Sequence, residues 1–248
     1  MEPKDQIIHF LKSKGYTVSE ETEGVVSQLA EMVASEEKSD IDGVLAWLEE
    51  KRRTTNLKVT QIPVKQIDRW KIHEETGDIS HDTGRFFQIV GVKTEGATDR
   101  EVLSWSQPIM KQEECGMLGI ICQVKDGVRH YLLWAKYEPG SIVKHQLSPC
   151  IQATLSNLDR AHGGKKPMFA EYFEEGSTKS KVIFSVEHVE DPGRFYLKTN
   201  KCVLVEVPPH EEVPVTDDFV WLTLPQVKKL LKMDKIMNSF ARAIFGNL

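Results

Sequence analysis

The chain has 248 residues and a mass of 28.2 kDa, and its 40% hydrophobic and 28% charged residues exclude a disordered or fibrous protein. The 32 Lys and Arg against 37 Asp and Glu leave a net charge of −5, which disfavours a general nucleic-acid-binding protein. No apolar run approaches the roughly 20 residues of a membrane-spanning helix, and the charged N-terminus lacks a signal-peptide core, so we expect a cytoplasmic protein that binds no membrane.

The first fifty or so residues are predicted to be helical, because apolar residues recur there at helical spacing. These positions are Ile7, Phe10 and Leu11, then Val25, Leu29, Met32 and Val33, then Ile41, Val44, Leu45 and Leu48. Ser39 or Asp40 is expected to cap the third helix, and the charged run 49–53 is interpreted as its solvated end. We therefore divide the chain into an N-terminal helical segment, 1–56, and a module, 57–248.

The module begins with short β-rich runs that turn residues separate. The runs are Phe86–Val92, Met117–Val124, Tyr131–Ala135, Val182–Val186 and Cys202–Val207. Asp126-Gly127 lies between two of them and predicts a hairpin turn.

Helices are predicted again at the end of the chain. Thr223-Leu224-Pro225-Gln226 fits a capping box, and an apolar stripe at Val227, Leu230 and Leu231 follows it. A second stripe runs through Ile236, Phe240, Ala243 and Ile244. The order of elements predicts an α+β fold with a mostly antiparallel sheet.

General searches for chemistry find little. There is no phosphate-binding glycine loop, zinc-protease motif or hydrolase nucleophile elbow, and the eight histidines are scattered, so a metal site is not expected. Cys115, Cys122, Cys150 and Cys202 form no C-x-x-C pair, which favours buried free thiols. The polar stretch 148–166 has small hydroxyl and amide side chains beside His162-Gly163-Gly164. It suits an anionic, polyhydroxylated ligand, but an ordinary polar surface loop explains it better on physical grounds alone.

An ordered series of short segments, from about Ala46 to the C-terminus, resembles the NDP-hexose 2,3-dehydratase family of deoxysugar biosynthesis. The segments are His81–Phe87, Val90–Val92, Trp105–Ile109, Gly116–Ile120, Ala135–Gly140, Gln146–Pro149, Gln152–Thr154, Ser156-Asn157, His162–Gly164, Glu171–Phe173, Asn200 and Trp221–Leu224.

The resemblance implies a Nudix-like mixed or antiparallel sheet flanked by helices. The family usually carries two such modules, whereas one fits this length, so we expect a homodimer that restores the pairing. The Nudix hydrolase signature itself is absent, so Mg²⁺-dependent pyrophosphate hydrolysis is not expected.

The family's reaction removes water from an NDP-4-keto-6-deoxyhexose. A base takes the C3 proton, which is acidified by the C4 ketone, and the C2 hydroxyl leaves; no redox cofactor is required. A partner 3-ketoreductase normally reduces the product. The site needs the base, an acid near the C2 oxygen and a donor to the C4 oxyanion.

The resemblance and the residue types together suggest catalytic and substrate-binding residues. His162 is the first choice for acid–base work, with a purely structural role equally open. Glu171 as base and Tyr172 as oxyanion donor are the second candidates, and the alternative for both is an ordinary amphipathic segment that only packs. His81 is a further candidate, and it fits a capping or structural role equally well. The predicted substrate-binding residues are Arg85, Trp105, Gln107, Lys136, Gln152, Thr154, Ser156, Asn157, Arg194 and Asn200. Strand alternation places Gln152, Thr154 and Ser156 on one face.

Departures from the family pattern keep other interpretations open. Trp134, Leu155 and Leu158 replace polar residues or an Arg of the family, which weakens the expected contacts to sugar or diphosphate. The alternatives are a non-catalytic nucleotide-sugar-binding module, a relative acting on another keto substrate, and a structural partner that assembles through the N-terminal helices.

Overall fold

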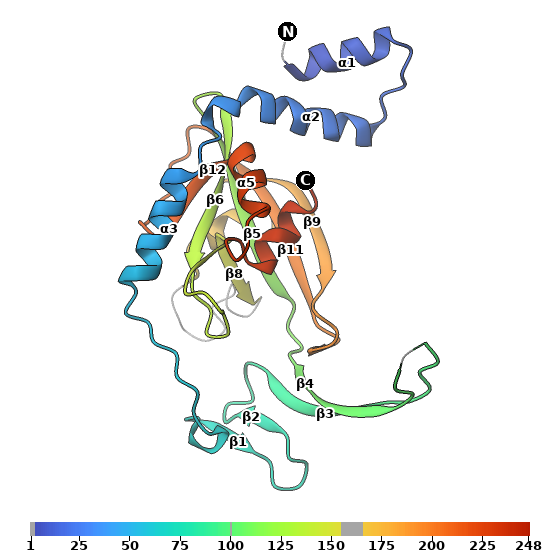
Figure 1. Ribbon diagram of the computed structural model, residues 1–248, viewed down its shortest axis with the longest axis vertical. Coiled ribbons are helices and arrows are strands. Elements are labelled where there is room, and N and C mark those ends of the chain that lie inside the picture. The colour runs from blue at the N-terminus through green and yellow to red at the C-terminus, as the bar shows by residue number, and fades with distance from the viewer. Residues whose placement is uncertain (1–2, 100, 155–165) are drawn as a thin grey trace.

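The computed structural model describes residues 3–99, 101–154 and 166–248. A central β-sheet carries helices on one side, two N-terminal helices project from one end, and a second, smaller sheet lies beyond the other end (Figure 1). This arrangement confirms the expected α+β class. No helix in the described ranges is long and apolar enough to cross a membrane.

Three N-terminal helices form as the apolar spacing predicts. They are α1 (Pro3–Ser13), α2 (Glu20–Ala34) and α3 (Asp42–Thr54), with a 3-10 turn, η1 (Glu36–Lys38), between the last two. The side chain of Ser19 caps α2 by accepting a hydrogen bond from the amide of Thr22. The N-cap position of α3 is held by Ile41 rather than by Ser39 or Asp40, although Asp40 Oδ1 accepts a hydrogen bond from the amide of Asp42 at 3.4 Å.

The larger sheet is mixed, with one parallel pair, and is mostly antiparallel as expected. Its path is β12 (Phe219–Thr223), β6 (Val128–Lys136), β5 (Gly116–Lys125), β11 (Thr199–Val207) and β9 (Lys181–Val189). Strands β5 and β11 run parallel, and the other neighbours on this path are antiparallel. The predicted hairpin turn joins β5 to β6, with Asp126 and Gly127 both at positive φ, as a tight two-residue hairpin requires.

Strands β5 and β6 separate from each other beyond the hairpin. The chain that fills the gap is β7 (Gln146–Pro149), which pairs with β6, followed by β8 (Ile151–Thr154), which pairs with β5. The end of β6 therefore faces the polar side chains of this inserted segment, which positions the candidate site.

The smaller sheet consists of β1 (Trp70–Ile72), β2 (Ile79–His81), β3 (Gln88–Thr94), β4 (Trp105–Lys111) and the short β10 (Phe195–Tyr196), and a 3-10 turn, η2 (Val64–Gln66), precedes it. We call residues 57–111, which hold η2 and β1 to β4, the arm. The arm is joined to the rest of the chain by the parallel pairing of β4 with β10 and lies away from the larger sheet (Figure 1).

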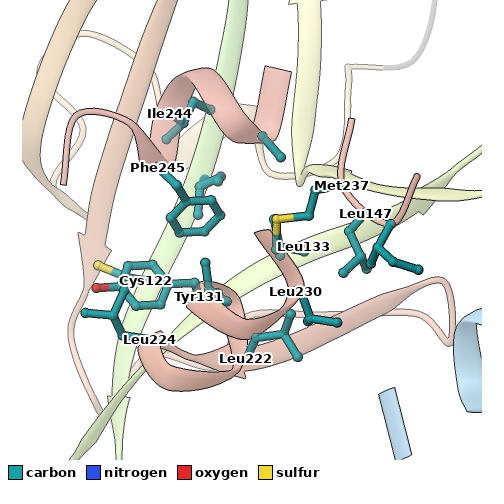
Figure 2. Packing of buried hydrophobic residues seen from close by; sticks show 14 of the residues in the cluster. Cys122, Tyr131, Leu133, Leu147, Leu222, Leu224, Leu230, Met237, Ile244 and Phe245 are labelled. Carbon is teal, nitrogen blue, oxygen red and sulfur yellow. The ribbon is translucent and has the colours of Figure 1, made fainter. Parts of the chain in front are cut away.

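The largest apolar cluster lies between the larger sheet and two C-terminal helices, α5 (Leu224–Leu231) and α6 (Ser239–Phe245) (Figure 2). The predicted capping box at Thr223 and Gln226 starts α5, and the backbone N–H of Thr223 donates to Gln226 Oε1 over 2.9 Å. Leu230 and Ile244 are fully buried, and each such side chain contributes about 1.5–3 kcal/mol.

Helix α3 packs into the same cluster through Val44 and Leu48. The charged end of α3 is not simply solvated: Lys51 Nζ lies 2.8 Å from carboxylate oxygens of both Asp217 and Asp218, and its side chain is only 15% exposed. The boundary predicted after residue 56 stays a prediction, although α3, on its N-terminal side, shares the module's core.

Candidate functional site

A half-buried lysine lies at the point where β5 and β6 separate. Lys136 is the last residue of β6, and its Nζ donates to Gln152 Oε1 of β8 over 2.8 Å. The same ammonium lies 2.5 Å from Glu138 Oε1 and 5.1 Å from the ring centre of Trp134. The side chain of Lys136 is 18% exposed. A cation fixed in this way is suited to a negatively charged oxygen of a ligand. We call Lys136, Glu138 and Gln152 the Lys136 cluster.

A row of residues crosses the sheet next to this cluster. Thr154 of β8 is opposite Gly116 of β5, and Gly116 is opposite Asn200 of β11. A Cβ atom on Gly116 would lie 2.2 Å from Asn200 Oδ1, so only glycine permits this approach. The buried side chain of Asn200 also donates a hydrogen bond to Glu190.

The two predicted binding residues on β8 share one face of that strand. Gln152 and Thr154 are half-buried and alternate with buried Ile151 and Ala153. Strand alternation accounts for this pattern. The predicted continuation to Ser156, together with Asn157 and His162, lies outside the described residues.

Glu171 and Tyr172 lie in the 3-10 turn η3 (Ala170–Tyr172), and Tyr172 packs in a second apolar cluster, separate from the one that α5 and α6 cover. Glu171 is half-buried, and its carbonyl accepts a hydrogen bond from Ser177 Oγ. Tyr172 is 1% exposed, and its hydroxyl donates to Glu211 Oε1 at 3.5 Å. Burial, with the negative charge of Glu211 second, raises the pKa of Tyr172 to about 12.

A cavity of about 500 Å³ opens beside this turn. Its lining mixes apolar side chains, Met117 and Phe173 among them, with polar and charged ones that include Glu174, Ser180 and Lys201.

The other predicted residues lie on the arm or at its junction with β10. His81 Nδ1 is 2.7 Å from Thr83 Oγ1, and the His81 ring has edge contacts with Trp70 and Phe86. Arg85 is exposed. These contacts make His81 part of a local turn on the arm rather than of the Lys136 cluster.

Trp105 and Gln107 form a second group, at the junction of β4 with the 190–194 loop. Trp105 Nε1 donates to Gln107 Oε1 over 2.8 Å, and Gln107 Nε2 donates to the carbonyl of Gly193 over 3.0 Å. Arg194 is ion-paired with Asp191. The predicted residues that the structure describes thus lie in four places of one copy, and among them Lys136, Gln152, Thr154 and Asn200 come from adjoining strand ends of the larger sheet.

Sequence reasoning missed several polar residues near these groups. Glu138, Glu190 and Lys201 carry no distinctive spacing, and their positions follow from strand register. Of these three, Glu138 alone lies in a segment that resembles the family, so the resemblance could have identified it as a candidate site residue. In the described ranges, no three His, Cys, Asp or Glu side chains gather closely enough to hold a metal ion.

A model of the NDP-hexose 2,3-dehydratase family matches residues 41–248. Three curated relatives carry the name dTDP-4-dehydro-6-deoxy-alpha-D-glucopyranose 2,3-dehydratase. The relative from Saccharopolyspora spinosa is 40% identical over 203 residues, which are 81% of this chain and 40% of the relative. Those from Amycolatopsis orientalis and Streptomyces violaceoruber are 38% and 33% identical, over 84% and 85% of this chain and 44% and 47% of their own lengths.

Solved structures with a similar fold include nucleotide hydrolases. An ADP compounds hydrolase covers 76% of this chain and 94% of its own, with 15% identity and a TM-score of 0.41. For an Ap4A hydrolase from C. elegans the match covers 54% of this chain and 97% of the hydrolase, with 15% identity and a TM-score of 0.35. For a Nudix hydrolase from M. smegmatis, RenU, it covers 54% of this chain and 86% of the hydrolase, with 14% identity and a TM-score of 0.33. Likeness at this level says nothing about activity.

Proposed function

The chain belongs to the NDP-hexose 2,3-dehydratase family, and from this membership we propose that it removes water from a nucleotide-linked 4-keto-6-deoxyhexose in deoxysugar biosynthesis. The observation that carries the proposal is the match of residues 41–248 to the family, with 33–40% identity to three curated dehydratases. The chain spans less than half the length of those relatives, so the activity of the whole protein is part of the proposal.

The proposed reaction is a proton abstraction followed by an elimination. A base removes the C3 proton, the C4 oxygen carries the developing negative charge, and the C2 hydroxyl leaves with a proton from an acid. Lys136 is proposed to donate to a negative oxygen of the substrate, either at C4 or in the diphosphate. Gln152 holds the ammonium in place over 2.8 Å, and Glu138 balances its charge.

His162 and Glu171 are proposed as the acid–base residues. For Tyr172 to act as the oxyanion donor, its hydroxyl must give up the hydrogen bond to Glu211 and donate to the substrate instead. Tyr172→Phe separates the roles: loss of one oxyanion donor lowers kcat by about 100-fold or more, whereas loss of a packing residue's hydroxyl changes it little.

The first experiment is incubation of the purified protein with dTDP-4-keto-6-deoxyglucose, a 3-ketoreductase and NADPH, followed by mass spectrometry. We expect a 2,6-dideoxy product. Failure to form product, together with thermal stabilisation by dTDP, would replace the proposal with a binding module or a different keto substrate. Neither product nor stabilisation would contradict the ligand class as well.

A non-catalytic binding module is the second candidate. The observation that favours it is the presence of Trp134 at a position where the family tends to have a polar residue. The centre of the Trp134 ring lies 5.1 Å from Lys136 Nζ. Turnover of any nucleotide-linked keto sugar would exclude this alternative.

The proposed partners are a 3-ketoreductase that consumes the diketo product and a second copy of this chain. A cytoplasmic location is proposed from the four free cysteines, since secreted proteins commonly pair theirs.

A further inference from the structure

Helices α1 and α2 lie outside the part of the chain that matches the family. The family model covers residues 41–248, and the two helices precede it. Residues 1–40 also carry the net charge, because four Lys and no Arg stand there against nine Asp and Glu, which gives −5. The 28 Lys and Arg of residues 41–248 equal their 28 Asp and Glu. A function of the helix pair is therefore separate from the chemistry of the family.

One side of α2 is anchored to the larger sheet. Val26 and Ala30 are buried, and a carboxyl oxygen of Glu31 accepts a hydrogen bond from the hydroxyl of Tyr131 in β6 over 2.9 Å. Arg129 of the same strand lies 3.3 Å from Glu31. Helix α1 packs along α2, and the pair projects beyond the sheet (Figure 1). Because α2 is already fixed in place, a partner that binds it pays no cost for ordering the helix.

Another side of α2 carries an apolar stripe. Val25, Leu29 and Val33 follow one another at intervals of four residues, so they lie on one face of the helix. These side chains are 49–66% exposed, whereas the neighbouring Val26 is 5% exposed. We call Val25, Leu29 and Val33 the α2 stripe. An exposed stripe with this spacing is typical of a helix that packs against another helix.

Acidic side chains lie at both ends of the α2 stripe. Glu21 is one helical turn before Val25, Glu36 and Glu37 follow the end of α2 in η1, and all three glutamates are exposed. An apolar centre with negative ends is complementary to a helix whose apolar face has Lys or Arg beside it. It disfavours a second copy, whose stripe has the same negative ends, and it disfavours anionic membranes and nucleic acids.

We propose that the α2 stripe binds an amphipathic helix of another protein, which carries apolar residues at helical spacing and Lys or Arg beside them. The partner's apolar side chains pack on the stripe, and its cations lie near Glu21 and the two glutamates of η1. Arg129, which contacts α2, and Lys136 are at opposite ends of β6, so the partner binds without covering the Lys136 cluster.

The test is titration of the full chain with a labelled helical peptide of about 18 residues, made only of Leu and Lys, with the Leu on one face. We expect a dissociation constant of about 10 µM. A peptide of the same pattern with Glu in place of Lys is the probe control, and it should bind at least about 10-fold more weakly. No binding of the Leu-Lys peptide at about 500 µM, or equal binding of the two peptides, would overturn the proposal.

The double variant Val25→Glu, Leu29→Glu separates docking on the stripe from plain charge attraction. It removes two apolar contacts but adds two negative charges, and Glu is a good helix former, so α2 is kept. Docking on the stripe predicts that the Leu-Lys peptide binds at least about 10-fold more weakly. Charge attraction alone predicts tighter binding, and that result would contradict docking.

A matched control adds the same two charges away from α2. Val59→Glu, Val189→Glu changes side chains that are 45% and 71% exposed, on the arm and in β9, and it should not weaken binding. Weakening by this control to the level of the stripe variant would place the peptide elsewhere and refute the proposal.

Hydrogen exchange of the wild-type protein gives an independent check should the stripe variant misfold. Amides of α2 are expected to exchange more slowly when the Leu-Lys peptide is added. Protection confined to other elements would exclude α2 as the binding surface.

Two controls test the other occupants of the stripe. Light scattering should give the same molar mass for the wild-type protein and the stripe variant, and a lower mass for the variant would make a second copy the occupant. Phosphatidylcholine vesicles should bind neither protein. Vesicles that bind the wild type alone would make a membrane surface the occupant, and either result would replace the proposal.

Discussion

Lys136 and Gln152 come from strands that pair with different neighbours, yet the ammonium of Lys136 donates to Gln152 Oε1 over 2.8 Å. The contact exists because β7 and β8 fill the gap between β6 and β5. The strand end that carries Gln152 thus holds a positive charge between Gln152 and Glu138.

Replacement of Lys136 by Met should weaken substrate use more than stability. Hydrogen bonds to a charged group contribute about 1.5–3 kcal/mol, so kcat/KM is expected to fall by roughly 10- to 100-fold. Steady-state kinetics and a dTDP thermal-shift assay measure the effect. Lys232→Met, in an exposed lysine, is the control and should match wild type. Equal kinetics for the two variants would remove Lys136 from the site.

The close approach of Gly116 to Asn200 predicts a pair of coupled substitutions. Gly116→Ala should destabilise the protein by about 1–3 kcal/mol, because the new methyl group would overlap Asn200 Oδ1. The control is Gly91→Ala in β3, where an added Cβ meets no atom within 4 Å. Urea unfolding measures both.

Truncation of Asn200 should relieve part of that strain. Asn200→Ala alone loses the hydrogen bond to Glu190, but the double variant with Gly116→Ala should be less destabilised than the sum of the single changes. Additive effects would mean that another neighbour, not Asn200, forbids the methyl group.

Glu31 links α2 to the sheet and should make stability depend on pH. Burial raises its pKa, although Tyr131 donates to it over 2.9 Å and Arg129 lies 3.3 Å away. The native state therefore holds the proton to higher pH than the unfolded chain does, and the free energy of unfolding falls as pH rises above the ordinary Glu pKa.

Glu31→Gln is expected to flatten this pH dependence, because the amide oxygen still accepts the Tyr131 hydrogen bond without a buried charge. Glu31→Ala should cost about 1–3 kcal/mol at all pH values, since Tyr131 then lacks an acceptor. Urea unfolding between pH 5 and pH 8 separates the two. An unchanged slope in Glu31→Gln would contradict the assignment.

The four thiols should react at different rates. Burial raises the pKa of Cys122 and Cys150 to about 12 and that of Cys202 to about 11, whereas Cys115 is partly exposed. The thiolate is the reactive form, so a raise of three pKa units lowers reactivity about 1,000-fold near neutral pH. A disulfide reagent should label Cys115 first and the other three only on unfolding. Four equal rates in native buffer would contradict the burial.

Local pattern predicted much of the fold. Helical spacing located all three N-terminal helices, β-rich runs between turn residues located the main strands, and the turn at Asp126-Gly127 and the capping box at Thr223 were correct in detail. Each of these features depends on residues within a few positions of one another, where side-chain chemistry is decisive.

Long-range features were not predictable in this way. The parallel pairing of Gly116 with Asn200 joins residues 84 positions apart, and nothing near either residue indicates it. Likewise, α2 buries Val26 and Ala30 and leaves Val25, Leu29 and Val33 exposed, because tertiary contacts rather than spacing decide which face is covered. Within the candidate site, the sequence predicted that Gln152 and Thr154 share one strand face. The contact of Gln152 with Lys136 was not predictable, because it depends on strand register.

The core that joins α3 to the C-terminal helices also constrains synthesis of the protein. Val44 of α3 and Ile244 of α6 belong to one cluster but are 200 positions apart. At bacterial or eukaryotic elongation rates, α3 emerges from the ribosome about 10–40 s before its partner helix exists. During that interval the apolar side of α3 and the inner faces of β5 and β6 are open to chaperones or to neighbouring nascent chains. Translation speed over the second half of the message is therefore expected to influence how much of this protein reaches its folded state.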